Sequence, residues 1–152
     1  MPLRVRPARA RDEAAIAALR AALWPEGSID SHLEETRAIL AGAPKSTMPL
    51  AIFVAEEARA LVGFIEVGLR SHADGCDPAR AVGFVEGWYV ADSHRGRGVG
   101  RALLLAAEGW SREQGCRELA SDTWIDDEGS QAAHVALGFE VVDRCVNFRK
   151  TL

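Results

Sequence analysis

The stretch "ADSHRGRGVGRALL" at residues 91–104 places three glycines and three arginines within seven positions, between a strand-like run and a helix-like run. Its glycines fit neither a P-loop, which ends in Gly-Lys-Ser/Thr, nor the GxGxxG dinucleotide fingerprint. What remains is Arg95-x-x-Gly98-x-Gly100 at the start of a helix. Bare backbone amides, the helix dipole and the arginine charges together attract a pyrophosphate. The stretch therefore predicts an anion site; the alternative is a glycine-rich helix turn with solvated arginines.

Apolar periodicity outward from this loop predicts a mixed sheet covered by helices. Strands are expected at residues 3–8, 50–57, 60–70, 81–90 and 116–123, helices at 11–24, 28–42, 98–115 and 127–138, and two closing strands within 139–152. This order, β-αα-βββ-α-β-α-ββ, belongs to the α/β class, and the length is that of one domain spanning 1–152. The buried face of the third long helix is expected to carry Val99, Leu103, Leu104, Ala107 and Trp110.

Composition narrows the functional classes. Apolar residues make up 48% of the chain and are spread evenly, which excludes a disordered or fibrous protein. The formal net charge of −4 disfavours nucleic acid as the main partner and suits a cationic ligand. No apolar run is long enough to span a membrane, and the basic N-terminus lacks the apolar core of a signal peptide, so a cytoplasmic protein is expected. Cys76, Cys116 and Cys145 have no paired spacing, which predicts neither a metal site nor a disulfide framework.

The loop and the element order resemble the GNAT N-acetyltransferase superfamily, in which an R/Q-x-x-G-x-G/A loop holds the pyrophosphate of acetyl-CoA. The resemblance implies a GNAT-type, mostly antiparallel sheet flanked by helices, with acetyl-CoA as co-substrate. It also implies that the strand before the loop splays from its neighbour and offers its backbone to the pantetheine arm, although "WYV" at 88–90 also fits plain sheet core. The implied cofactor-binding residues are Trp88, Tyr89, Val90, Arg95, Gly96, Arg97, Gly98, Val99, Gly100 and Arg101.

A second motif, "DEGSQAAHVALGF" at residues 127–139, resembles the N-x-x-A-x-x-x-Y-x-x-x-G-F helix and turn of the same family. Asp127 stands in place of the asparagine, which implies a contact with the cofactor. His134 stands in place of the tyrosine that often reprotonates the leaving thiolate of CoA. The resemblance thus implies a cofactor contact or general acid at His134, and the alternative is a core or capping histidine.

Several stretches are similar to the aminoglycoside 6′-N-acetyltransferase branch of that superfamily. The similarity implies acetyl transfer to the 6′-amino group of these antibiotics, hence a role in resistance, and a homodimer joined through the C-terminal strands. Two other functions stay open: acetyl transfer to another small amine such as a polyamine, and a non-catalytic acyl-CoA-binding module. The stretches lie at residues 19–28, 63–70, 84–90, 115–123, 130–140 and 147–152.

Two carboxylates are candidates for the acceptor chemistry. A protonated amine must lose a proton before it attacks a thioester, and a carboxylate can attract the cation and accept that proton. Glu86 lies inside an apolar strand, where a charge is costly unless it faces a cleft or a partner, so we expect it to be the base. Asp122 ends the neighbouring short strand, and the two side chains are expected to converge. The alternatives are a surface position for Glu86 and a turn or helix cap for Asp122. The three cysteines lack a recognisable base partner or a suitable position, which favours direct transfer in a ternary complex over a covalent intermediate.

Three further residues are candidates for substrate contact. Trp24 fits an aromatic wall for a sugar ring or a core position at the end of a helix. His72 stands where the branch carries an aromatic residue, and Asp143 matches a substrate-contacting acid, with a turn between the closing strands as the alternative. His32 and His94 are expected to be solvated.

Overall fold

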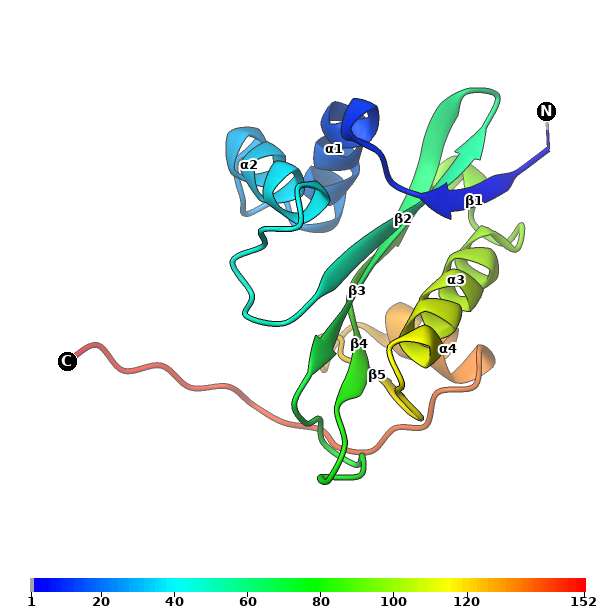
Figure 1. Ribbon diagram of the computed structural model, residues 1–152. Helices are drawn as coiled ribbons and strands as arrows, with labels where there is room; N and C mark the ends of the chain where they lie inside the picture. Colours follow the sequence, from blue (N-terminus) through cyan, green and yellow to red (C-terminus); the bar gives the residue numbers. More distant parts are fainter. Residues whose placement is uncertain (1) are drawn as a thin grey trace.

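A five-stranded sheet forms the centre of the computed structural model, which describes residues 2–152. Its strands lie in sequence order: β1 (Arg4–Pro7), β2 (Leu50–Glu57), β3 (Ala60–Arg70), β4 (Val82–Val90) and β5 (Leu119–Ser121). The first four pair antiparallel, and β5 pairs parallel with β4. Helices α1 (Glu13–Leu23) and α2 (Ile29–Leu40) cover one face, α3 (Val99–Glu113) covers the other, and α4 (Glu128–Ala136) follows β5 (Figure 1). The predicted α/β class with a mostly antiparallel sheet is confirmed.

Local sequence signals set the ends of the helices. Ser28 precedes α2, and its hydroxyl accepts a hydrogen bond from the Ser31 amide at 3.1 Å, as expected for a cap. Gly115 adopts a φ of 86° just beyond α3, a left-handed conformation that commonly ends a helix. A one-turn 3-10 helix (Ala10–Asp12) leads into α1, so α1 itself begins later than the predicted helix at 11–24.

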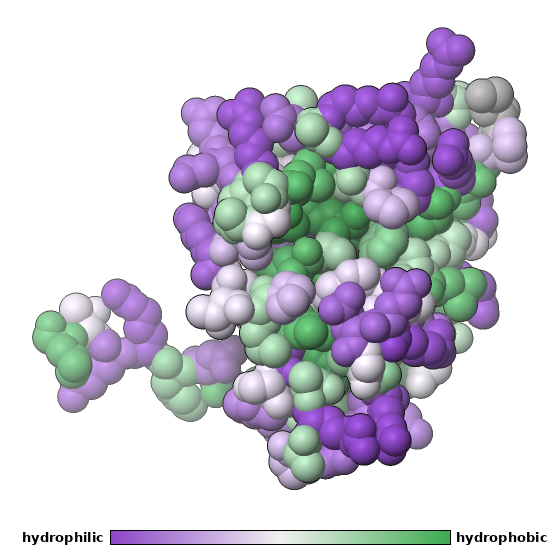
Figure 2. Space-filling model, viewed as in Figure 1, coloured by the Kyte–Doolittle hydropathy of each residue, from purple (hydrophilic) through white to green (hydrophobic). Residues whose placement is uncertain are grey.

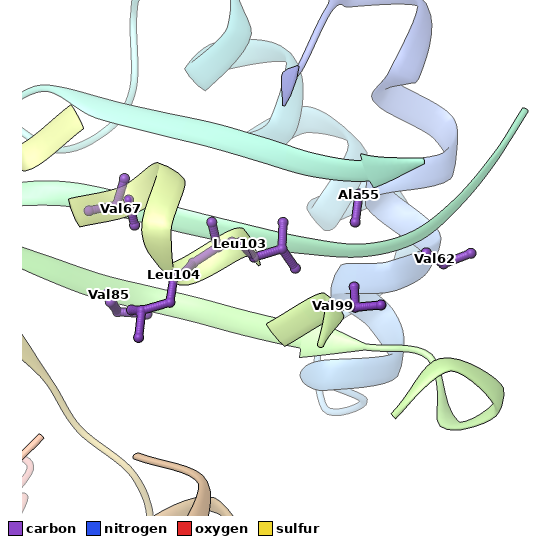
Figure 3. Close-up of a cluster of buried hydrophobic side chains, with 9 residues drawn as sticks. Ala55, Val62, Val67, Val85, Val99, Leu103 and Leu104 are labelled. Atoms are coloured by element: carbon purple, nitrogen blue, oxygen red, sulfur yellow. The ribbon is translucent and has the colours of Figure 1, made fainter. Parts of the chain in front are cut away.

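Two apolar clusters fasten the helices to the sheet. The larger cluster joins side chains of β2, β3, β4 and α3 (Figure 3). On α3 it buries Val99, Leu103, Leu104 and Ala107, and Trp110 packs against its edge, which confirms the predicted buried face. The second cluster attaches α1 and α2 to the opposite face of the sheet and consists of Ile16, Ile39, Ile52, Val54 and Phe64.

The C-terminal segment differs from the prediction. Residues 139–152 form no strand or helix and extend away from the body of the protein (Figures 1 and 2). Apolar side chains on this segment remain exposed, Phe148 at 94% of its surface and Val146 at 67%. An extended segment becomes a strand only when another backbone pairs with it, and no other described segment does so here. The prediction of two closing strands is therefore wrong.

Two histidines expected to be solvated are held by partners. His32 is buried, and its Nε2 lies 2.9 Å from the Trp24 carbonyl oxygen. The His94 Nε2 lies 2.9 Å from the carboxylate of Glu57. Both expectations were wrong because each ring finds a polar group on a neighbouring element, a contact that local sequence does not reveal.

Other general features of the described chain bear on function. Cys76, Cys116 and Cys145 are free thiols, and burial raises the pKa of the first two, so neither of these is an activated nucleophile. Within residues 2–152, none of the helices combines the length and apolar character needed to cross a membrane. The same residues contain no group of three or more His, Cys, Asp or Glu side chains placed to hold a metal ion.

Candidate active site

A bulge in β4 determines where the acceptor-side carboxylate lies. Glu66 of β3 pairs with Gly87, and the next residue, Val67, pairs with Val85, so Glu86 has no residue opposite it. A bulge bends its strand and redirects the side chain of the extra residue. Glu86 accordingly lines a cavity on the face of the sheet that α1 and α2 cover.

Strands β4 and β5 separate next to this bulge. Their parallel pairing extends only from Gly83 to Val85 on β4 and from Leu119 to Ser121 on β5. From Trp88 to Val90, the edge of β4 that continues past β5 pairs with no other strand among residues 2–152. Unpaired N–H and C=O groups on a strand edge can bond an extended ligand. The edge of β4 that the family resemblance implies for the pantetheine arm is thus free of a partner strand.

The loop between β4 and α3 presents backbone amides to open space. Gly96 and Gly98 have positive φ values of 72° and 84°, a conformation that favours glycine. A Cβ atom on either residue would meet no heavy atom within 4 Å. Gly98 precedes α3 without a side-chain cap from the described residues, which leaves the first N–H groups of the helix free. Free amides at a helix N-terminus form a site for a phosphate group.

Three arginines surround this helix start. The Nε of Arg95 donates a hydrogen bond to the Val90 carbonyl oxygen at 3.0 Å, which ties the loop to the end of β4. Arg97 pairs with Glu57 at 3.3 Å, and Arg101 is exposed on the first turn of α3. The Arg95 and Arg97 side chains are 58% and 53% exposed, so both guanidinium groups can still reach an anion in solution.

The cavity beside Glu86 has a volume of about 500 Å³ and is acidic. Four glutamates, Glu26, Glu35, Glu66 and Glu86, line it together with one arginine, Arg20. An excess of carboxylates concentrates cations, most strongly a ligand that carries several ammonium groups.

Arg20 joins two of these carboxylates at the wall of the cavity. Its Nη1 donates a hydrogen bond to Glu66 and its Nη2 to Glu35, and only 4% of its side chain is exposed. Burial raises the pKa of the Glu66 carboxyl; the Arg20 charge opposes that rise and the negative charge of Glu86 adds to it. Glu66 and Glu86 are thus near enough for their charges to interact.

Trp24 lines the same cavity and also packs against the core. Its ring meets Phe64 edge-on with 6.2 Å between centroids, and the Arg20 guanidinium lies 4.8 Å from the ring centroid. His32 stacks on it with the centroids 6.3 Å apart. The sequence left a substrate wall and a core position as alternatives; Trp24 packs against the second apolar cluster and also lines the cavity, so its contact with a substrate stays a prediction.

The carboxylate of Glu86 is held by a cation. Nε and Nη2 of Arg70 donate hydrogen bonds to its two oxygens at 2.9 and 2.8 Å. The Arg70 guanidinium also lies 3.5 Å from the centroid of the Phe84 ring. The hydrogen bond to Glu86 raises the pKa of Arg70, and the charge of Asp122 contributes to the rise. Asp122 is exposed, and no hydrogen bond or ion pair joins it to Arg70 or Glu86 among residues 2–152, so the expected convergence of the two carboxylates stays a prediction.

His134 lies where α4 faces β4 and β5. Its Nδ1 is 2.7 Å from the Ser130 carbonyl oxygen and must donate there, so Nε2 of the neutral ring accepts from the Ser121 hydroxyl at 2.8 Å. The ring packs edge-on against Trp88, with the centroids 5.3 Å apart. Asp127 caps α4 by accepting a hydrogen bond from the Ser130 amide at 2.9 Å.

The structure separates the remaining candidates from the cavity. His72 and Asp143 are exposed, and neither belongs to the residues that line the cavity. Three residues of the site, Arg20, Glu66 and Arg70, were not among those predicted from the sequence. Glu66 carried a usable signal, because it is a charge inside the apolar run of β3, just as Glu86 is inside that of β4.

Comparisons with known proteins agree with this geometry. The pattern of the Acetyltransferase (GNAT) family matches residues 14–139. An aminoglycoside N(6′)-acetyltransferase type 1 from Klebsiella aerogenes is 42% identical and covers 97% of this chain and 96% of that protein. A protein of the same name from Stenotrophomonas maltophilia is 46% identical, with 97% and 93% covered.

Solved structures are similar over the same length. The structure of AAC(6′)-Iy in complex with the bisubstrate analogue CoA-S-monomethyl-acetylneamine aligns with a TM-score of 0.89 at 35% identity and covers 100% of both chains. The structure of that enzyme in complex with CoA also aligns with a TM-score of 0.89, covering 99% of this chain and 96% of the other.

Proposed function

The chain belongs to the GNAT acetyltransferase family, and from this premise we propose that it transfers the acetyl group of acetyl-CoA to the 6′-amino group of aminoglycoside antibiotics. Transfer takes place directly, with both substrates bound. The relatives with 42% and 46% identity are named for this activity and match almost the whole chain. The corresponding biological role is antibiotic resistance. The enzyme consists of one domain, spanning 1–152, in this proposal.

The observation that carries the proposal is an acidic cavity lined by Glu86, two residues before the free edge of β4 begins at Trp88. Aminoglycosides carry several ammonium groups, and the four glutamates of the cavity outnumber its single lining arginine. A neutral or anionic acceptor would gain nothing from this charge. The cavity also offers Trp24 as an apolar surface for a sugar ring.

The donor side uses the loop and the strand edge. Acetyl-CoA supplies the activated thioester. The free N–H groups at the start of α3, with Arg95, Arg97 and Arg101 around them, hold the diphosphate in this proposal. The edge of β4 from Trp88 to Val90 that pairs with no strand bonds the pantetheine arm, and its free N–H groups stabilise the negative charge that develops on the thioester oxygen.

Proton transfer is assigned to residues at either end of this edge. Glu86 attracts the acceptor ammonium and takes its proton, and Asp122 adds negative charge beside it. His134 returns a proton to the leaving thiolate from the side of the site where α4 packs on Trp88, and for this step its Nε2 must first take up a proton, because Nδ1–H is bonded to the Ser130 carbonyl oxygen. We leave His72 and Asp143 out of the acceptor site, because neither side chain lines the cavity.

The activity is tested by thiol release from acetyl-CoA with a matched pair of acceptors. Neomycin carries a 6′-amine and paromomycin a 6′-hydroxyl, so we expect thiol release with neomycin alone and an acetyl group at the 6′ nitrogen in the product. Spermidine tests the polyamine alternative. Release with spermidine and not neomycin would contradict the acceptor, and acetyl-CoA binding without release for any amine would indicate a binding module.

The base assignment is tested separately with Glu86→Gln. Removal of a general base costs about 100-fold or more in turnover. We expect kcat with neomycin to fall by that factor while the dissociation constant of acetyl-CoA, measured by calorimetry, changes less than about twofold. Undiminished kcat would remove Glu86 from the base role.

We also propose that the protein is a homodimer in the cytoplasm. The support for the dimer is the extended segment 139–152, whose exposed valines and Phe148 suit pairing with an edge strand of a second copy. The support for the cytoplasm is the acetyl-CoA requirement and three free thiols. Sedimentation should give a dimer for the full chain and a monomer after deletion of residues 140–152.

A further inference from the structure

Arg70 holds the two oxygens that the acceptor amine needs. Its guanidinium donates to both Oε1 and Oε2 of Glu86, at 2.9 and 2.8 Å. An acceptor ammonium that approaches Glu86 through the cavity meets a carboxylate whose charge is already balanced. Binding of the acceptor and the Arg70 pair therefore compete for one negative charge.

The position of Arg70 permits it to leave. Its side chain is 43% exposed, and it lies at the end of β3, where the chain passes into the exposed loop at 71–81. Arg20 contrasts with it, since its side chain is 4% exposed and bonded to two glutamates.

We propose that Arg70 is a resident cation of the acceptor site, which neutralises Glu86 in the free enzyme and moves into solvent when the acceptor ammonium takes its place. This inference rests on the proposed function. The exchange lowers the affinity of every cation by the same factor. Acceptors that also contact Glu26 and Glu35 still bind, whereas a lone ammonium has no second contact to offset the loss. Arg70 thereby sets an affinity threshold that acceptors with several amines pass, while the ratio of affinities between acceptors stays the same.

The test is calorimetric binding of kanamycin, with CoA present so that no acetyl transfer occurs. Arg70→Gln removes the competing cation and should tighten kanamycin binding about fivefold, the scale of an exposed bidentate ion pair. Arg80→Gln is the matched control: it removes the same charge from an exposed arginine, 48% exposed and paired with Asp77 at 3.7 Å. We expect Arg80→Gln to change kanamycin binding less than about twofold.

The route through Glu86 is tested by a double-mutant cycle. In a Glu86→Gln background no carboxylate is left to compete for, so Arg70→Gln should then have no effect on kanamycin binding. Arg70→Lys keeps the charge but loses the pair of hydrogen bonds to the two oxygens of Glu86. It should therefore tighten kanamycin binding by less than Arg70→Gln does. Melting temperature and acetyl-CoA affinity verify that each variant is folded, and Arg70→Lys carries the test if Arg70→Gln does not fold.

Each contrary outcome points to a different error. If wild-type protein binds kanamycin and Arg70→Gln binds it equally or more weakly, Arg70 supports Glu86 and the exchange is wrong. Tightening that persists in the Glu86→Gln background also overturns it, because the competition then involves another group. If the wild-type protein neither binds nor acetylates kanamycin, the proposed function fails and this inference fails with it.

Discussion

Gly87 is the position where one added methyl group should separate acceptor binding from cofactor binding. A Cβ at this residue would lie 2.5 Å from Cη2 and 2.8 Å from Cζ2 of Trp24. Ordinary contact begins at 3.4 Å, so the indole edge must retreat by about 0.9 Å in Gly87→Ala. Phe64 and His32 pack against the same ring, which leaves the cavity as the direction of retreat.

Gly87→Ala is expected to weaken binding of the acceptor. Overpacking by one methyl group costs roughly 1–3 kcal/mol, part of which appears as lost stability and part as a narrower cavity. We expect the dissociation constant of kanamycin to rise about tenfold, equivalent to about 1.4 kcal/mol. The acetyl-CoA constant should change less than about twofold, because the backbone of β4 keeps its N–H and C=O groups.

Calorimetry with each ligand measures both constants, and Trp24→Phe supplies the control. The smaller ring removes the atoms that clash, so adding Gly87→Ala to Trp24→Phe should cost less than about twofold in kanamycin affinity. If Gly87→Ala instead weakens acetyl-CoA and kanamycin equally, β4 has moved rather than Trp24. Unchanged kanamycin binding would refute the placement of Trp24 in the acceptor wall.

Three further changes test the loop before α3, the buried ion pair of Arg6 and Asp12, and the stability of α3. Gly98→Val places a side chain at φ 84° where nothing within 4 Å obstructs it, so the protein should fold at a cost of about 1–2 kcal/mol but bind acetyl-CoA at least about tenfold more weakly by calorimetry. Arg6 lowers the pKa of Asp12 in a pair whose side chains are 4% and 7% exposed, so the pair stabilises the fold above about pH 4 and its contribution is lost as pH falls through the folded-state pKa. Asp12→Asn should cost about 3 kcal/mol in urea unfolding at pH 7 and flatten that acid dependence; an equally steep acid dependence in the variant would contradict the assignment. Gly109→Ala in α3, where a Cβ meets nothing within 4 Å, should raise the free energy of unfolding by about 0.5–1 kcal/mol, and a lower melting temperature would contradict this.

Elements determined by near neighbours in sequence were predicted well. The strands expected at 50–57 and 60–70 match β2 and β3, because two apolar, β-rich runs flank a short polar turn. The turn is closed by Ala58 and Arg59 at φ 50° and 65°, without a glycine. The start of α3 was predicted for the same reason, since its glycines and the apolar face of the helix lie within a few turns of each other.

Features that depend on distant partners were missed. Segment 139–152 has the apolar residues of a strand, but a strand also needs a partner strand, and within residues 2–152 this segment pairs with none, although β1 and β5 lie at the edges of the sheet. Arg20 and Glu66 are 46 positions apart, so their buried bond cannot be read from spacing. The Arg70 pair with Glu86 was missed because its geometry depends on the bulge in β4.

The bulge at Glu86 explains how one short strand serves two substrates of opposite charge. Without the extra residue, alternation along β4 would place Glu86 and Gly87 on opposite faces, whereas Glu86 lines the acidic cavity and a Cβ at Gly87 would meet Trp24 of the same cavity. Pairing with β5 has already ended at Val85, so the backbone that follows is free for the donor. The carboxylate for the amine and the amides for the thioester thus lie within five residues, 86–90. Changes that straighten this strand should therefore impair both substrates together, whereas changes confined to the wall of the cavity impair the acceptor alone.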